Sequence, residues 1–201
     1  MSTKAVFLDK DGTLIEDVPY NVDPARIRLT EGAAEGVRLL HARGYRLIVV
    51  SNQSGVARGL FPEAALGPVA ARLRALLAEA GVPLAGFYYC PHHPEGSEDA
   101  YRRACTCRKP APGLLRRAAA DHGLDLARSW LIGDILDDVE AGHRAGCRAI
   151  LLDNGHETEW LPGPHRRPDY RAATLADAAL WIAQADGMPG MEYSARLGGT
   201  A

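Results

Sequence analysis

Ala5-Val-Phe-Leu-Asp-Lys-Asp-Gly-Thr13 is the stretch from which the fold of this chain can be worked out. Four apolar residues, 5–8, run directly into Asp9, a pattern typical of a short strand that is buried on both faces. Two carboxylates, Asp9 and Asp11, stand one residue apart, and Gly12 follows them. The pattern predicts that both acids lie at the C-terminal end of a central strand, the edge at which open α/β sheets bind ligands.

The two neighbouring carboxylates have two possible explanations. They repel each other and partial burial makes both harder to ionise, so a divalent cation would keep Asp9 charged beside an anionic substrate. A carboxylate held in this way can attack phosphorus, while Asp11 protonates the leaving oxygen and then deprotonates water. Gly12 would allow a sharp turn, and Thr13 is expected to hydrogen-bond locally to hold it. The alternative is an ordinary turn at a strand end, and this stretch alone leaves both open.

Composition limits the class of protein. The chain has 201 residues, of which 47% are hydrophobic and 24% charged, and its net charge is −2. This length suits one sizeable core, and the charge gives no reason to expect a nucleic acid or a membrane surface as a partner. Apolar runs are too short for a membrane span, and the first strand begins too early to follow a signal peptide. We expect a cytoplasmic protein and a monomer.

Further apolar runs alternate with helical patterns, as in α/β proteins with a parallel sheet. The stretch 14–30 has no clear period and predicts a long flap, on which Tyr20 and Asn21 either contact a substrate or are surface turn residues. Residues 1–185 are expected to form one domain, and 186–201 a flexible tail. Strands are expected over 5–8, 46–50, 86–89, 129–132 and 148–152, and helices over 33–43, 62–80, 113–122, 175–184 and from Asp138 onward.

Polar residues also follow the second and fourth expected strands. Ser51 takes the same kind of position as Asp9, and a hydroxyl with free backbone amides at that point suits a phosphoryl group. Asp134 fits a third metal ligand, and Asp138, four residues later, would either hold bound water or orient Lys109. Asp137 is explained by capping of the helix that begins there.

A metal-ligand pattern lies between 90 and 107. Cys90 and His92 form one close pair and Cys105 and Cys107 a second, separated by a loop, a spacing that can close tetrahedrally on zinc. Three thiolates and one imidazole leave no open position, which indicates structural Zn²⁺. His93 could compete with His92 but is assigned to the substrate side or the surface. Reduced surface cysteines are the alternative.

Two cations, Arg108 and Lys109, follow Cys107 immediately. If a metal holds Cys107, it also places the next two side chains. Lys109 would then bind a phosphoryl group near Asp9 as a point charge, and Arg108 would bind a second anionic part of the substrate through its planar fork. The alternative is a solvated basic pair.

Taken together, the strand-end motifs resemble the haloacid-dehalogenase-like (HAD-like) superfamily of phosphohydrolases. The resemblance extends over nearly the whole chain up to about Asp153. The Cys/His loop followed by 107–110 is similar to the branch that contains heptose-1,7-bisphosphate 7-phosphatases, of lipopolysaccharide precursor synthesis, and histidinol-phosphate phosphatases. The stretches 51–55, 57–59 and 88–97 look closer to the heptose enzymes, whose zinc loop is long, and we expect no second domain of the kind found in the bifunctional histidine enzyme.

This resemblance implies a Rossmann-like three-layer α/β fold with a central parallel sheet, a zinc-binding loop insertion and no large cap domain. It implies Mg²⁺ held by Asp9, the backbone carbonyl of Asp11 and Asp134. Asp9 would be the nucleophile and Asp11 the general acid/base. The substrate, a small phosphorylated sugar, would contact Asp17, Tyr20, Ser51, Asn52, Gln53, Ser54, Arg108 and Lys109.

One residue departs from the heptose pattern. Heptose enzymes commonly carry a basic residue directly after the last motif aspartate, and here that residue is Ile135. The reaction class is therefore better supported than the substrate, and cleavage of histidinol phosphate or another small phosphomonoester stays open. A catalytically idle, zinc-stabilised binding protein is the alternative from another class.

Overall fold

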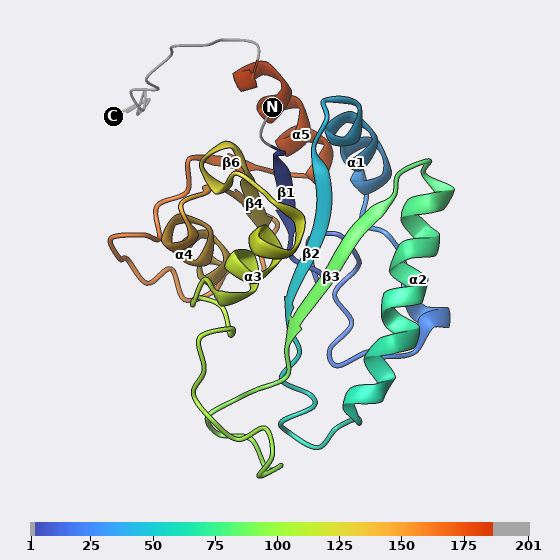
Figure 1. The fold of residues 1–201 in the computed structure, drawn as a ribbon, viewed down its shortest axis with the longest axis vertical. Helices are drawn as coiled ribbons and strands as arrows, with labels where there is room; N and C mark the ends of the chain where they lie inside the picture. The colour runs from blue at the N-terminus through green and yellow to red at the C-terminus, as the bar shows by residue number, and fades with distance from the viewer. Residues whose placement is uncertain (1–2, 187–201) are drawn as a thin grey trace.

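The structure is a computed structural model of the chain, and it describes residues 3–186. Its centre is one six-stranded sheet in which all neighbouring strands are parallel (Figure 1). The strand order is β3-β2-β1-β4-β5-β6, the doubly wound arrangement of Rossmann-like folds. The strands are β1 (Ala5–Leu8), β2 (Arg46–Asn52), β3 (Leu84–Cys90), β4 (Trp130–Gly133), β5 (Arg148–Leu152) and β6 (Tyr170–Ala172).

Helices cover both faces of this sheet, so the fold has three layers. In Figure 1, α3 and α4 lie to the left of the sheet and α1 and α2 to its right. Short 3₁₀ turns precede some of the elements, at Pro24–Arg26, Glu63–Ala65 and Leu126–Arg128. The helices are α1 (Ala33–Ala42), α2 (Leu66–Glu79), α3 (Gly113–His122), α4 (Leu136–Ala145) and α5 (Leu175–Asp186).

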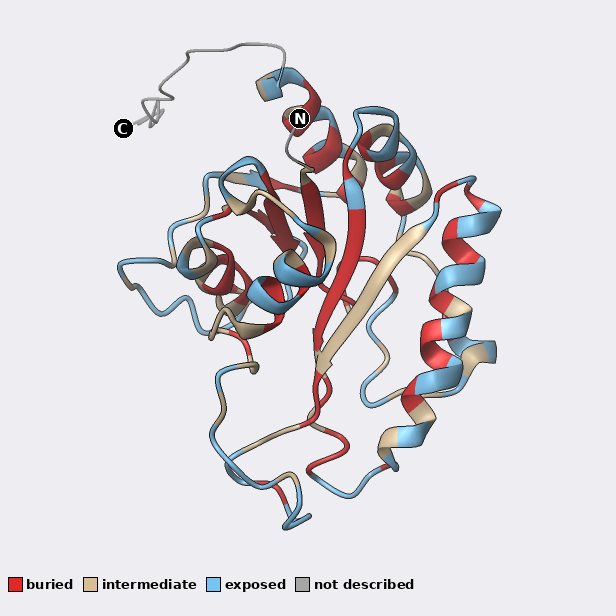
Figure 2. Ribbon diagram, viewed as in Figure 1, coloured by how far each residue is buried: buried red, intermediate tan, exposed pale blue. Residues whose placement is uncertain are grey.

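Successive side chains of a strand point to opposite faces of the sheet, so the hydrophobic core is divided between these two faces. Val6 and Leu8 pack in the cluster that also holds buried residues of α1, α2 and α5. Ala5 and Phe7 point the other way, into the cluster built with α3. All four residues are fully buried, and Figure 2 shows β1 and most of β2 as buried, in contrast to β3. The prediction of a strand buried on both faces is therefore confirmed, as is the three-layer α/β fold.

The structure corrects several predicted boundaries. A sixth strand, β6, lies between the predicted strand 148–152 and the predicted helix 175–184, where the sequence predicts no element. It is only three residues long and pairs with β5 alone, so it has little apolar pattern of its own. The α-helix α2 begins at Leu66, after a 3₁₀ turn and not at Pro62. Asp186 belongs to α5, whereas the rest of the predicted tail, 187–201, lies outside the described residues.

The pairing register brings the C-terminal ends of β1, β2 and β4 to one edge of the sheet. Leu8 pairs with Val49 of β2 on one side and with Ile132 of β4 on the other, so the residues that follow these strands meet at one edge of the sheet. The flap 14–30 leaves this edge and is pinned by an antiparallel bridge between Ile15 and Leu29. Within residues 3–186, no helix is long and apolar enough to cross a membrane.

Candidate active site

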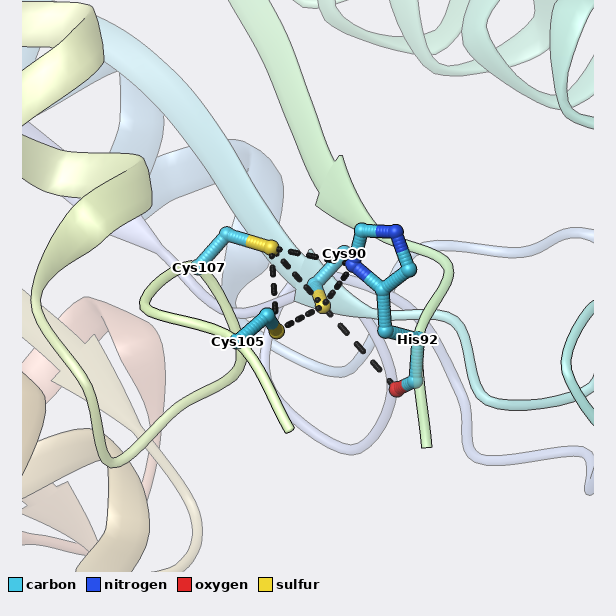
Figure 3. Close-up of side chains that lie close together, drawn as sticks. All are labelled: Cys90, His92, Cys105 and Cys107. Carbon is cyan, nitrogen blue, oxygen red and sulfur yellow. Dashed lines mark hydrogen bonds between the residues drawn. The ribbon is translucent and has the colours of Figure 1, made fainter. Parts of the chain in front are cut away.

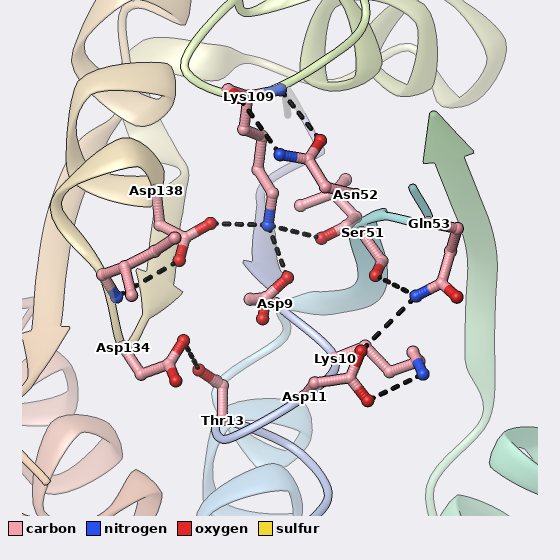
Figure 4. Close-up of polar contacts among 12 residues, drawn as sticks. Asp9, Lys10, Asp11, Thr13, Ser51, Asn52, Gln53, Lys109, Asp134 and Asp138 are labelled. Carbon is pink, nitrogen blue, oxygen red and sulfur yellow. Dashed lines mark hydrogen bonds and ion pairs between the residues drawn. The ribbon is translucent and has the colours of Figure 1, made fainter. Parts of the chain in front are cut away.

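Lys109 stands at the centre of a polar cluster at this edge of the sheet (Figure 4). Its Nζ donates a hydrogen bond to the Asp9 carboxylate, lies 2.5 Å from Asp138 Oδ1 and donates to the backbone oxygen of Val50 at 3.1 Å. Lys109 and Asp138 are almost completely buried. Asp138 therefore pairs with Lys109 in this structure, which is one of the two roles considered for it.

The cluster holds more negative than positive charge. Oxygen atoms of Asp9, Asp134 and Asp138 all lie within 4.8 Å of one another, and Lys109 is the ammonium group among them. Burial and the charge of Asp9 raise the pKa of Asp134 to about 7. Burial opposes protonation of Lys109, but the charges of Asp138 and Asp9 outweigh it and raise the pKa of the lysine. A hard divalent cation, which prefers oxygen ligands, fits this donor set.

Asp11 is half-buried next to this cluster and has two partners of its own. Lys10 Nζ donates to Asp11 Oδ1 at 2.7 Å, and Gln53 Nε2 lies 3.4 Å from Oδ2. Burial raises the pKa of Asp11, an effect that the charge of Lys10 reduces. A carboxyl group with a raised pKa can hold the proton that a general acid must deliver.

The turn after β1 and the start of α4 differ from expectation in their hydrogen bonds. The Thr13 hydroxyl lies 3.4 Å from Asp134 Oδ1, so it reaches across to the residue after β4 and does not hold its own turn. Asp137 does not cap α4, because its carboxylate pairs with Arg166 at 2.9 Å. A residue from the loop after β5 supplies the acceptor: Glu157 Oε2 accepts from the Leu136 amide at 2.6 Å.

The C-terminal end of β2 positions the lysine. Asn52 accepts from the Lys109 backbone N–H at 3.0 Å and donates to the Lys109 carbonyl at 3.1 Å, so its side-chain amide is used on both sides. Ser51 is buried, and its hydroxyl accepts from Gln53 Nε2 at 2.8 Å. Of the predicted substrate contacts at the end of β2, Asn52 thus holds Lys109 in this structure.

Two adjoining hollows lie over the cluster. The first, of about 250 Å³, is lined by the Asp9, Lys109 and Asp134 group together with Ser51 and Ile135. The second, of about 260 Å³, lies under the flap and is lined by Tyr20, Gln53 and Ser54 among others. Both hollows share the same three wall residues, which are Asp11, Asp17 and Asn52. All predicted site residues from the flap and from the segment 51–54, at the end of β2, therefore surround one composite space.

Cationic groups gather around His93. Arg58 Nη2 lies 3.3 Å from His93 Nε2. Burial, together with the charges of Arg108 and Arg58, lowers the pKa of this histidine. Within residues 3–186, the Nη1 atom of Arg108 is buried with no hydrogen-bond partner. An unpaired guanidinium nitrogen of this kind is suited to an incoming anionic group.

The Cys/His pattern forms a second cluster, at the C-terminal end of β3 (Figure 3). The Sγ atoms of its three cysteines are 3.1–3.5 Å apart, and His92 Nδ1 lies 3.4 Å from Cys107 Sγ. Sulfur atoms around tetrahedral zinc are about 3.8 Å apart, so the cluster is close to the size of a metal-bound set. Among the described residues, this group of donors includes His92 and not His93, whose Nδ1 accepts from the backbone N–H of Glu95.

Sequence reasoning missed two side chains that contact this site. Lys10 is 2% exposed and contacts Asp11, and its position between the two motif aspartates is the signal that could have found it. His156, from the loop after β5, lies with Nδ1 2.7 Å from Asp134 Oδ2. No local pattern marks His156, since the two residues are 22 positions apart and meet only in the fold.

Comparison with known proteins agrees with this fold and site. A family model described as HAD-hydrolase-like matches residues 106–178. A relative from Escherichia coli (strain K12) is 42% identical over 177 residues, which are 88% of this chain and 92% of the relative. The chain belongs to the HAD-like hydrolase family and is a phosphoric monoester hydrolase, as the strand-end motifs predict.

Within the family, the similarity is to one kind of phosphatase. The Escherichia coli relative is a D-glycero-beta-D-manno-heptose-1,7-bisphosphate 7-phosphatase. The enzyme of the same name from Salmonella typhi is 42% identical over 151 residues, which cover 75% of this chain and 80% of that one. A solved D,D-heptose 1,7-bisphosphate phosphatase from B. bronchiseptica, complexed with magnesium and phosphate, has a TM-score of 0.73 and 30% identity. That match covers 90% of this chain and 99% of that chain.

Proposed function

We propose that this chain removes the 7-phosphate of D-glycero-D-manno-heptose 1,7-bisphosphate, through an aspartyl-phosphate intermediate on Asp9. The observation that carries the proposal is the pair of adjoining hollows. One surrounds the reactive carboxylate and Lys109, and the other, under the flap, is of a size for a sugar. The similarity to heptose bisphosphate phosphatases over 88% of the chain supports the choice of substrate.

The chemistry needs two carboxyl groups and one fixed cation. An Asp9 oxygen attacks phosphorus and forms the P–O bond as the bond to the sugar oxygen breaks. Asp11 gives its proton to that oxygen, then removes a proton from the water that attacks the phosphoryl group, which regenerates Asp9. Lys109 and Ser51 would hold the phosphoryl oxygens, and the lysine ammonium would offset the charge that develops on them.

The proposed metals follow from the two donor sets. Asp9, Asp134 and the backbone carbonyl of Asp11 would hold Mg²⁺, which when bound neutralises charge on the nucleophile and the phosphoryl group. Cys90, His92, Cys105 and Cys107 would hold Zn²⁺ in a closed site without a catalytic position. The excess of buried carboxylate supports the first assignment, and the three close sulfur atoms support the second.

The substrate assignment depends on a second anionic site. The buried, unpaired Nη1 of Arg108 supports its assignment to the distant phosphate of a bisphosphate. Asp17, Tyr20, Gln53 and Ser54 would contact the sugar from the walls of the second hollow. We further propose that residues 1–185 act as one domain, and as a monomer in the cytoplasm.

A phosphate-release assay with a substrate panel tests this proposal. The panel contains both anomers of heptose 1,7-bisphosphate, histidinol phosphate and a chromogenic phosphomonoester, each with Mg²⁺ and with EDTA. We expect Mg²⁺-dependent release from all four, with the highest kcat/KM on one of the bisphosphate anomers. Preference for histidinol phosphate would replace the substrate and leave the mechanism in place. No release from any compound would support an idle binding protein.

A further inference from the structure

The loop after β5 closes one side of the proposed metal site. Asn154 Nδ2 donates to the carbonyl of Gly12 at 2.8 Å, and Glu157 accepts from the first amide of α4. These two contacts join the loop to the turn after β1 and to the start of α4. Residues 154–157 are therefore held on the two segments that carry the aspartates of the cluster.

His156 lies between these two anchors and contacts a proposed metal ligand. Its Nδ1 is 2.7 Å from Asp134 Oδ2, while the Thr13 hydroxyl lies 3.4 Å from the other oxygen. Gly12 makes this approach possible, because a Cβ at that position would stand 2.2 Å from Asp134 Oδ2 and 2.3 Å from His156 Nδ1. The backbone of Gly12 has φ +73°, which also disfavours any other residue there.

We propose that His156 is a positioning residue that fixes Asp134 for the binding of Mg²⁺, and this inference rests on the metal site of the proposed function. Each carboxylate oxygen has two lone pairs, so a hydrogen bond from Nδ1 does not prevent the carboxylate from ligating a cation. Partners that hold a metal-ligating side chain in this way typically account for 10- to 100-fold in metal affinity or activity.

A purely structural role would predict a different result. The His156 side chain is 38% exposed, so its removal opens no internal cavity. The Asn154 and Glu157 contacts remain in its absence and continue to hold the loop. The loss of His156 should therefore change metal binding without a comparable change in folding.

Isothermal titration of the purified protein with Mg²⁺, without substrate, measures this effect directly. We expect His156→Ala to weaken Mg²⁺ binding about tenfold, and the Mg²⁺ concentration for half-maximal activity to rise by a similar factor. His156→Asn should remain close to wild type, because its amide nitrogen stands near the position of Nδ1. His156→Gln should resemble the alanine variant, because its amide nitrogen stands near Nε2 instead. His165→Ala, an exposed histidine of the same connection, is the control and should bind as wild type.

Several outcomes would overturn the inference. Equal Mg²⁺ affinity in wild type and His156→Ala would leave no role for the hydrogen bond. Tighter binding in the alanine variant would mean that the imidazole competes with the ion for Asp134. A glutamine variant with wild-type affinity beside an impaired asparagine variant would assign the effect to Nε2. If the wild type itself binds no Mg²⁺, the metal site of the proposed function is wrong. If the wild type binds Mg²⁺ and His156→Ala binds it equally well, only the role of His156 is wrong.

Discussion

The two clusters of potential metal ligands in this molecule are built in opposite ways. The Cys/His cluster comes from one short stretch, 90–107, and its donors are soft sulfur and nitrogen atoms. The carboxylate cluster draws Asp9, Asp134 and Asp138 from segments more than a hundred residues apart. The first can close around an ion almost by itself, whereas the second exists only when β1 and β4 are paired.

The two clusters also differ in charge. The carboxylates are buried and share one ammonium group, so the site keeps an excess of negative charge that suits a cation and a phosphoryl group together. The Cys/His cluster has no comparable opening toward substrate in its proposed closed form. The two meet through the chain, since Cys107 is two residues before Lys109. In our proposal the carboxylate cluster performs the chemistry, while the Cys/His cluster holds in place the Lys109 ammonium group that the chemistry needs.

The largest difference between the two clusters should appear when the reactive carboxylate is removed. Asp9→Asn should lower turnover by roughly 10⁴-fold or more, because a neutral amide of nearly the same shape cannot attack phosphorus. Phosphate release measures activity, and circular dichroism checks the fold. Asp121→Asn, which changes an exposed aspartate on α3, should behave as wild type. Near-native turnover by Asp9→Asn would rule out a covalent route through Asp9.

Loss of one sulfur tests the supporting role of the other cluster. Cys107→Ser should release bound zinc and lower kcat by about 10- to 100-fold, because Arg108 and Lys109 lose their anchor. The Mg²⁺ dependence should stay unchanged. Metal analysis by mass spectrometry and a Mg²⁺ activation curve measure the two effects, and Cys147→Ala, outside the cluster, is the matched control. An active, folded wild-type protein without zinc would contradict the assignment.

Arg108 distinguishes the reacting phosphate from the distant one. Arg108→Ala should reduce kcat/KM for heptose 1,7-bisphosphate by about 10- to 100-fold, the range for one charge-assisted hydrogen bond. A chromogenic monophosphate should lose far less, since it offers no second anion. Arg102→Ala, an exposed arginine of the Cys/His loop that pairs with Asp99, controls for net charge. Equal losses on the two substrates would place Arg108 at the reacting phosphoryl group.

The smallest expected effect is on the free energy of unfolding, and it concerns a histidine–aspartate pair outside both clusters. His143 Nε2 lies 2.9 Å from Asp169 Oδ2, and this hydrogen bond raises the pKa of the histidine. The stabilisation is therefore complete below the unfolded pKa of about 6.5 and is lost as pH rises through the folded value. We expect His143→Gln to lower the free energy of unfolding by about 1 kcal/mol or less at pH 5.5. The difference should shrink at pH 9, and a constant difference in urea denaturation across this range would contradict it.

Local patterns in the sequence determined the main features of the fold. The largely apolar runs at 5–8, 46–50 and 148–152 predicted central strands because parallel strands covered on both faces need apolar side chains on both sides. The same pattern placed Asp9 and Asp134 at strand ends, and strand order then brings those ends together. The spacing of the four Cys/His residues predicted their cluster, since donors that are close in the chain need little tertiary help to meet.

Only the tertiary structure decided the contacts between distant segments. The three residues of β6 have too little pattern to be seen, because an edge strand of that length takes its form from β5. Thr13 reaches Asp134 and Glu157 reaches α4 because the loops after β1 and β5 lie against the β4–α4 junction. His156 meets Asp134 for the same reason, through the space that Gly12 leaves. Hydrogen bonds of this kind depend on which loops the sheet places side by side. The spacing of residues along the chain does not reveal that arrangement.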